Sequence, residues 1–266
     1  MNKATFFKNI RKRNSGIFGT SLSQAQVDGT DAILDECMSQ GADIGQTAYI
    51  LATAYGETGG KMRPVRENMN YSAKRIPQVF SAKRRQGIPA SKLAYNPQLL
   101  ANTVYGGPWG AANLGNRIGT TDGWDFRGFW IGQITGYNNA KKWAAGLGVD
   151  LIGKPYLLDD PKLAVKGLVL PMLEGWATGK SLGQYVTGTK RDYVEARRVW
   201  NGTFAATKYA GYAKAFEAAL DAAGYAAQAT IAPQAPVIPK PIPKPPAASI
   251  WAAIVAFIAS FRKAEP

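Results

Sequence analysis

Histidine is absent from this sequence of 266 residues, and cysteine occurs once. Without histidine the chain has no Ser-His-Asp triad, no Cys-His pair and no imidazole ligand for zinc. The one cysteine, Cys37, cannot form a disulfide within the chain and lies in an apolar helical pattern that predicts burial. We therefore expect no metal and no cofactor. If the protein is an enzyme, its carboxylates are the groups left for proton transfer.

The N-terminus lacks an apolar stretch long enough for a signal peptide. Phe6, Phe7 and Ile10 have helical spacing instead and predict a short amphipathic helix. We therefore expect the protein to be made in a cytoplasm and to stay there unless something else releases it.

Acidic residues are few, with 18 Asp and Glu against 32 Lys and Arg, which gives a formal net charge of +14. A basic balance attracts polyanions, among them nucleic acid and the phosphate-rich and carboxylate-rich envelope of bacteria. The basic residues are scattered apart from short runs at 11–13 and 83–85, and no nucleic-acid motif accompanies them. We expect no specific nucleic-acid partner, and a basic surface that serves solubility alone stays an alternative.

Apolar periodicity and helix-start signals predict a mostly helical domain over residues 1–228 with a small β region. The segment 106–128, rich in Gly, Asn, Asp and Trp, predicts irregular loop and small strands. Breaks at Pro77, Pro89 and Pro97 divide the preceding segment into short helical pieces. The predicted helices span residues 23–39, 43–57, 137–147, 161–177, 190–200 and 204–222.

The composition changes after this domain. Residues 229–246 are rich in proline and predict an extended linker. Residues 247–266 predict a hydrophobic helix with bulky side chains on one face, although its apolar run is shorter than a membrane span requires. This helix could lie on a membrane, span it marginally or dock on a protein. Basic residues near the run predict contact of residues 247–263 with anionic lipid.

One stretch, Thr47–Ala73, carries the first candidate catalytic residue. It opens as an apolar, helix-compatible run, places Glu57 at its end and breaks at Gly59 and Gly60. A carboxyl group at the end of a buried helix is in a low dielectric, which favours its protonated form. The pattern therefore predicts that Glu57 can donate a proton, although a glutamate at an exposed helix end also fits.

Ten residues later, Glu67 follows in a polar segment close to Arg63 and Arg66. Because arginine favours an ionised carboxylate, we expect Glu67 to stay charged. Two carboxyl groups with pKa values pushed apart are what an acid–base pair needs. Glycoside hydrolysis uses such a pair, one group protonating the leaving oxygen while the other activates water or attacks carbon.

A second polar motif follows the glycine-rich segment. Gln133 and Thr135 are two residues apart and would share one face of a strand, and Asn138 and Asn139 then enter a helix. Amides and a hydroxyl on one face suit sugar hydroxyls, N-acetyl groups and an attacking water. A capped turn with no ligand fits the same pattern.

Taken together, four motifs resemble glycoside hydrolase family 19, the chitinase-like family, and more narrowly the phage and prophage endolysins of its lysozyme-like superfamily. The resemblance runs in order from about Leu22 to Leu220. It implies an α+β, mostly helical, lysozyme-like bilobal domain with a small β region. The motifs are AYILATAYGETGG, VRENMNYS, GQITGYNNA and RRVWNGT.

The resemblance also implies a role for each motif. Glu57 corresponds to the general acid, and Glu67 to the base that activates water in an inverting mechanism. Thr135 corresponds to the hydroxyl that helps hold this water. The positions that correspond to the sugar-binding residues are Gln133, Asn139 and Asn201.

Three departures from the family pattern lie near these residues. Gly56 stands where the family usually has histidine before the acid. Residues 128–130 read Gly-Phe-Trp where the family has Gly-Arg-Gly, and Gly132 alters the link to Gln133. No departure removes a carboxylate, so we expect catalysis to be retained.

Three functions fit these observations. The favoured hypothesis is an endolysin that is made in a bacterial host, acts in the periplasm or cell wall, and cleaves the glycan strands of peptidoglycan. The alternatives are a chitinase acting on N-acetylglucosamine polymers and a non-enzymatic protein that binds the envelope or disrupts membranes.

Overall fold

The computed structural model describes residues 1–226, which divide into two compact units. Among these residues, the first unit comprises residues 1–64 and 160–226, and the second comprises residues 65–159. Helices dominate both units, so the predicted helical class is confirmed. The predicted linker at 229–246 and the predicted apolar helix at 247–266 lie outside the described residues.

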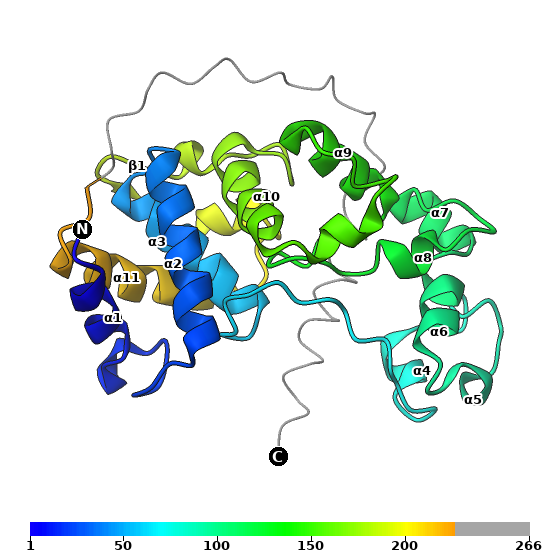
Figure 1. Ribbon diagram of the computed structural model, residues 1–266. Helices are drawn as coiled ribbons and strands as arrows, with labels where there is room; N and C mark the ends of the chain where they lie inside the picture. The colour runs from blue at the N-terminus through cyan, green and yellow to red at the C-terminus, as the bar shows by residue number, and fades with distance from the viewer. Residues whose placement is uncertain (227–266) are drawn as a thin grey trace. The chain divides into compact units, whose positions relative to one another are not determined.

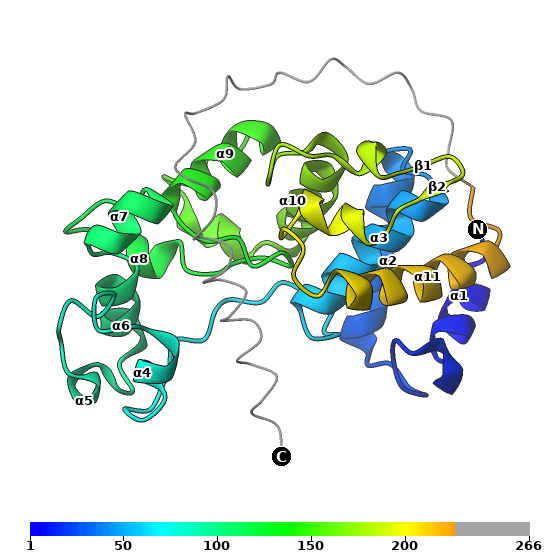
Figure 2. The same cartoon turned by 180° about the vertical axis from the view of Figure 1, so that it is seen from behind.

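The first unit is built around helix α3, Ile44–Glu57, which is buried along most of its length. It packs most extensively against α11, Ala206–Ala222, and also contacts α2 and α10 (Figures 1 and 2). The remaining elements of this unit are α1 Lys3–Ile10, α2 Gln24–Ser39, α10 Pro161–Glu174, the strands β1 Val186–Thr187 and β2 Lys190–Arg191, and 3₁₀ helices at Arg13–Ser15, Leu182–Gln184 and Glu195–Val199.

Local sequence explains where the central helices begin. The Asp43 side chain accepts a hydrogen bond from the backbone amide of Gln46, and the side-chain oxygen of Gln46 accepts one from the Asp43 amide, which forms a capping box. Ser23 and Gln26 form the same arrangement at the start of α2. These contacts satisfy amide groups that a helix start leaves unpaired. The predicted helices at 23–39 and 43–57 are confirmed to within one residue at each end.

The second unit consists of short helices around an apolar cluster. Helix α6, Pro97–Val104, supplies Leu100, Ala101 and Val104 to this cluster, together with Phe80 from the end of α4. Helices α5 and α8 contact α6, and α7 contacts α9 (Figure 1). The other helices are α4 Ile76–Val79, α5 Ala90–Leu93, α7 Pro108–Leu114, α8 Asp122–Asp125, α9 Tyr137–Leu147 and a 3₁₀ helix at Pro155–Asp159.

The predicted place of the β region is wrong. Segment 106–128, expected to be irregular with small strands, contains helices α7 and α8, and α7 begins with Pro108, a favoured first helical residue. In residues 1–226 the strands are β1 and β2, a short antiparallel pair joined through Gly188. Strand β2 lies at the start of the segment 190–200, which was predicted to be helical. Residues 186–191 form a tight hairpin there instead.

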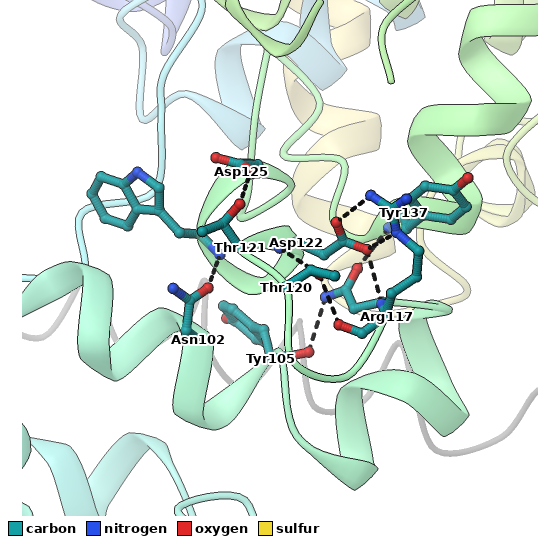
Figure 3. A network of polar contacts seen from close by, with 10 residues as sticks. Asn102, Tyr105, Arg117, Thr120, Thr121, Asp122, Asp125 and Tyr137 are labelled. Atoms are coloured by element: carbon teal, nitrogen blue, oxygen red, sulfur yellow. Dashed lines mark hydrogen bonds and ion pairs between the residues drawn. The ribbon is translucent and has the colours of Figure 1, made fainter. Parts of the chain in front are cut away.

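A polar network fixes the loop between α7 and α9 (Figure 3). The carboxylate of Asp122 is buried and accepts hydrogen bonds from the amide and the guanidinium group of Arg117 at 2.8–2.9 Å. Asn116 donates to the Tyr105 carbonyl and accepts from the Tyr137 amide. The network connects α6, the loop and α9 within the second unit.

Candidate active site

Glu57 lies at the last position of α3, and its side chain is 1% exposed. Thr58 closes the helix by donating its hydroxyl to the Ala54 carbonyl, and Gly59 and Gly60 then adopt the left-handed conformation. The helix therefore ends directly after the glutamate, as the Gly-Gly pattern predicts.

Two side chains donate to the same carboxylate oxygen of Glu57. Arg197 Nη2 lies 2.8 Å from Oε1, and the Tyr209 hydroxyl lies 2.9 Å from it. Arg197 comes from the 3₁₀ helix Glu195–Val199, and Tyr209 comes from the first turn of α11. The sequence predicted an apolar environment for Glu57. The environment differs from this prediction in one respect, because the buried cation of Arg197 lies against the carboxylate.

Arg197 makes further contacts besides its ion pair with Glu57. Its guanidinium group lies 3.8 Å from the centre of the Tyr209 ring, and its Nε donates to the Phe204 carbonyl. Burial lowers the pKa of Arg197, but the charge and hydrogen bond of Glu57, together with Tyr209 and Tyr49, outweigh this and leave the pKa above its ordinary value. Arg197 therefore remains a cation inside the first unit.

Three buried polar atoms near this ion pair have no hydrogen-bond partner among the described residues. They are Glu57 Oε2, Arg197 Nη1 and Asn201 Oδ1. Asn201 lies one turn after Arg197, and its backbone N–H donates a hydrogen bond to the Arg197 carbonyl. Polar groups that are left unpaired when buried are costly, and such groups are often functional. Oε2 of Glu57 is thus the carboxylate oxygen that has no partner among the described residues.

Glu67, from the second unit, is also buried, with 4% of its surface exposed. Its Oε1 accepts from the Tyr105 hydroxyl at 2.8 Å, and its Oε2 accepts from the Gly128 amide at 3.1 Å. Its own amide donates to the Gly128 carbonyl, and Arg127 Nε donates to its carbonyl. Backbone and side chain are both fixed against residues 127–128.

The polar loop environment expected for Glu67 is wrong, because its side chain is buried. Burial raises the pKa of Glu67, and the donors Tyr105 and Gly128 and the charges of Arg84 and Arg127 only partly oppose this effect. Arg66 turns away to donate to the Asp125 carbonyl, and an ion pair links it to Asp159. The sequence around Glu67 does not indicate that Arg127 and Gly128, about 60 residues further along the chain, enclose this residue.

Gly128 gives Glu67 and Gln133 room to approach. A Cβ atom at this position would lie 2.8 Å from Gln133 Oε1 and 3.1 Å from Glu67 Cβ. A side chain here would therefore displace at least one of the two residues. The following Phe129 and Trp130 are fully buried, so this departure from the family pattern places two aromatic rings in the core.

The polar motif after the glycine-rich segment is not a strand. Gln133 has a left-handed φ of 52°, between Phe129 and Ile134, which form an isolated bridge. Its side-chain amide donates to the carbonyls of Val65 and Trp130. A left-handed glutamine is uncommon, and the sequence pattern gave no indication of it.

The structure nevertheless brings the members of this motif together. Thr135 is buried, and its hydroxyl lies 3.4 Å from the Gln133 carbonyl. Asn139, in the first turn of α9, donates to the Thr135 carbonyl at 2.8 Å. Within the second unit, Glu67, Gln133, Thr135 and Asn139 therefore form a connected set. Glu57 and Asn201 belong to the first unit.

Neither a metal centre nor a membrane span is found in the described part of the chain. Residues 1–226 contain no group of three or more His, Cys, Asp or Glu that could hold a metal ion. No helix among them is both long and apolar enough to cross a membrane. Cys37 is buried, as predicted.

Comparison with known proteins gives a sequence relative and several structural likenesses. No protein-family model matches the sequence. A segment of 107 residues is 36% identical to a glycosyl hydrolase family 19 domain-containing protein of Haemophilus influenzae. The match covers 40% of this chain and 50% of that relative, so this chain spans about half of the relative's length.

The structural likenesses are distant. Chitinase C from Streptomyces griseus has a TM-score of 0.43 and 16% identity, covering 86% of this chain and 78% of that one. A chitinase C mutant has a TM-score of 0.42 and 14% identity, covering 86% of this chain and 95% of that one. The sequence match relates a segment of 107 residues to a glycosyl hydrolase family 19 domain-containing protein.

Proposed function

We propose that this protein hydrolyses a glycan that contains N-acetylglucosamine, by an inverting acid–base mechanism. The observation that carries the proposal is that each unit holds one buried glutamate, Glu57 or Glu67, fixed by hydrogen-bond donors. The sequence relation to family 19 supports the same activity.

In this mechanism Glu57 donates a proton to the leaving oxygen. Arg197 then stabilises the carboxylate that remains, because its guanidinium group is already in place on Oε1. Oε2, the oxygen without a partner in the described residues, carries the proton before transfer.

Glu67 takes the proton from the attacking water. A general base is more effective when its pKa lies closer to the working pH, and burial raises the pKa of Glu67 in this direction. Thr135 helps hold the water, and Gln133, Asn139 and Asn201 contact the sugar. These roles are the ones that the family resemblance implies.

Peptidoglycan is the substrate that we favour, and chitin is the alternative. A net charge of +14 favours association with an anionic cell wall. The resemblance to endolysins supports the same substrate, and we propose with it synthesis in a bacterial host and action in the periplasm or cell wall. Contact of residues 247–263 with an anionic membrane belongs to the same proposal and rests on the sequence.

Digestion of purified substrates tests the proposal. The full-length protein would be incubated with purified murein and, separately, with chitin oligomers, and the products analysed by mass spectrometry. New reducing ends from murein support an endolysin and identify the sugar whose bond is cut. Products from chitin alone would favour the chitinase, and no product from either substrate would contradict glycan hydrolysis.

A further inference from the structure

We propose that Tyr209 is a positioning residue for Glu57, and that Gly56 is a glycine because the Tyr209 ring occupies the space of its side chain. This inference rests on the proposed role of Glu57 as the acid. It also gives a physical reason for the first departure from the family pattern, in which Gly56 precedes the catalytic glutamate.

The contacts of Tyr209 place it on the carboxylate. Its hydroxyl lies 2.9 Å from Glu57 Oε1, and its ring carries the guanidinium group of Arg197 at 3.8 Å. Arg197 in turn donates to the same Oε1. Each of these three residues therefore contacts the other two, and all of them are buried.

Gly56 makes this arrangement sterically feasible. A Cβ atom on Gly56 would lie 2.2 Å from Tyr209 Cε1 and 2.6 Å from its hydroxyl oxygen, closer than any real contact. The backbone of Gly56 is ordinary helix within α3, so the requirement is for space and not for an unusual φ. Even alanine would have to push the ring of Tyr209 away from Glu57.

The two hydrogen-bond donors on Oε1 fix the rotation of the Glu57 carboxyl group about its last side-chain bond. With Arg197 and Tyr209 both bonded to Oε1, Oε2 is held on the opposite side and has no partner among the described residues. Without the hydroxyl, one donor remains and the carboxyl group can rotate about its last bond. Misplacement of a catalytic group lowers the rate of the chemical step more than it weakens substrate binding.

Removing only the hydroxyl tests this role. We expect Tyr209→Phe to lower kcat by about 10- to 100-fold with little change in KM. The substrate would be a soluble fragment of whichever glycan the wild-type protein hydrolyses. The matched control is Tyr212→Phe, the same chemical change one turn further along α11, where the ring packs against Tyr55. The control should keep wild-type kcat.

The outcomes separate the two proposals. A wild-type protein without activity on any of the glycans would overturn the proposed function and the positioning role together. An active wild type with an equally active Tyr209→Phe variant would overturn the positioning role alone. A Tyr209→Phe variant with raised KM and unchanged kcat would also overturn it, because it would indicate a binding role.

A stability measurement tests the part played by Gly56 without any substrate. Alanine is normally better than glycine inside a helix. We expect Gly56→Ala to lower Tm in the wild-type background, where the ring must move, and to raise Tm in a Tyr209→Ala background, where the space is empty. A Tm change of the same sign in both backgrounds would overturn the inference that the two residues share one space.

Discussion

Glu57 and Glu67 are both buried, but their neighbours differ in charge. Glu57 is paired with the cation of Arg197, whereas the hydrogen-bond donors of Glu67 are the neutral Tyr105 hydroxyl and Gly128 amide. Burial consequently raises the pKa of Glu67. The proposed roles of the two glutamates can be tested one residue at a time.

Replacing the acid should stop turnover. Glu57→Gln keeps the shape of the side chain but cannot donate the proton, so we expect kcat to fall by about 10²- to 10⁴-fold. The far-ultraviolet circular dichroism spectrum of the variant should match that of the wild type, and such a match would show that the fold is kept. Near-normal hydrolysis by this variant would remove Glu57 from the mechanism.

Replacing the base should lower activity by a similar factor of about 10²- to 10⁴-fold and should also change how stability depends on pH. Because the pKa of Glu67 is raised in the folded protein, its favourable contribution is complete below the unfolded pKa and is lost as pH rises through the folded pKa. Glutamine does not titrate. The stability of Glu67→Gln relative to wild type should therefore increase as pH rises above the unfolded pKa of glutamate.

Urea unfolding at several pH values measures this difference. Tyr71→Phe is a suitable reference, because it changes a neighbouring buried tyrosine hydroxyl and leaves Glu67 in place. A stability difference that stays constant or decreases with rising pH would show that the pKa of Glu67 is not raised.

The burial of Glu57 could be predicted from the sequence, whereas the partners of the two glutamates could not. Glu57 follows a buried helical run and precedes Gly59 and Gly60, a pattern that is visible locally. Arg197 and Tyr209 lie 140 and 152 residues away from Glu57, and only tertiary packing brings them there. For the same reason, the local arginines gave the wrong surroundings for Glu67.

At the scale of elements, the helices with clear start signals were predictable. Helices α2, α3 and α10 begin at capping residues that the sequence displays. The turn at Gln133 could not be predicted, because its left-handed backbone depends on contacts of its side-chain amide with Val65 and Trp130. Tertiary contacts therefore overrode the alternating pattern that predicted a strand.

The network of Asp122 gives a prediction for the loop between α7 and α9. Burial alone would raise the pKa of Asp122, but the hydrogen bonds from Arg117 lower it below its ordinary value. We expect Asp122→Ala to lower Tm by about 5 °C or more, because several hydrogen bonds to one charge are lost.

Two comparisons check this prediction. Asp125→Ala is the control, because Asp125 accepts one exposed hydrogen bond from Thr121 and should change Tm far less. The stabilisation by Asp122 is present above its unfolded pKa and is lost as pH falls through its folded pKa. The gap in Tm between wild type and Asp122→Ala should therefore narrow in acid. A gap that widens in acid would contradict the lowered pKa.

At the scale of the whole molecule, the candidate residues are divided between the two units. Glu57 and Asn201 come from the first unit, and Glu67, Gln133, Thr135 and Asn139 come from the second. The net charge of +14 belongs to the complete chain and includes basic residues in the predicted tail. We therefore expect glycan hydrolysis and attraction to an anionic envelope to be separable.

Truncation tests this separation. We expect a protein shortened after Ala229 to hydrolyse isolated murein as the full-length protein does, because the candidate catalytic residues all precede this point. Binding to anionic liposomes, measured by co-sedimentation, should fall on truncation and should weaken with added salt in the full-length protein. Equal sedimentation of both forms would contradict the proposed membrane contact.

The central claim is that Glu57 and Glu67 hydrolyse a glycan as an inverting pair. Proton NMR of a fresh digest reports the anomeric configuration of the first product before mutarotation equilibrates it. The account predicts that the configuration at the cleaved carbon is inverted, since an inverting enzyme places water between its two carboxyl groups. It also predicts that neither Glu57→Gln nor Glu67→Gln releases product at the wild-type rate. A product with retained configuration would contradict the role of Glu67 as the base.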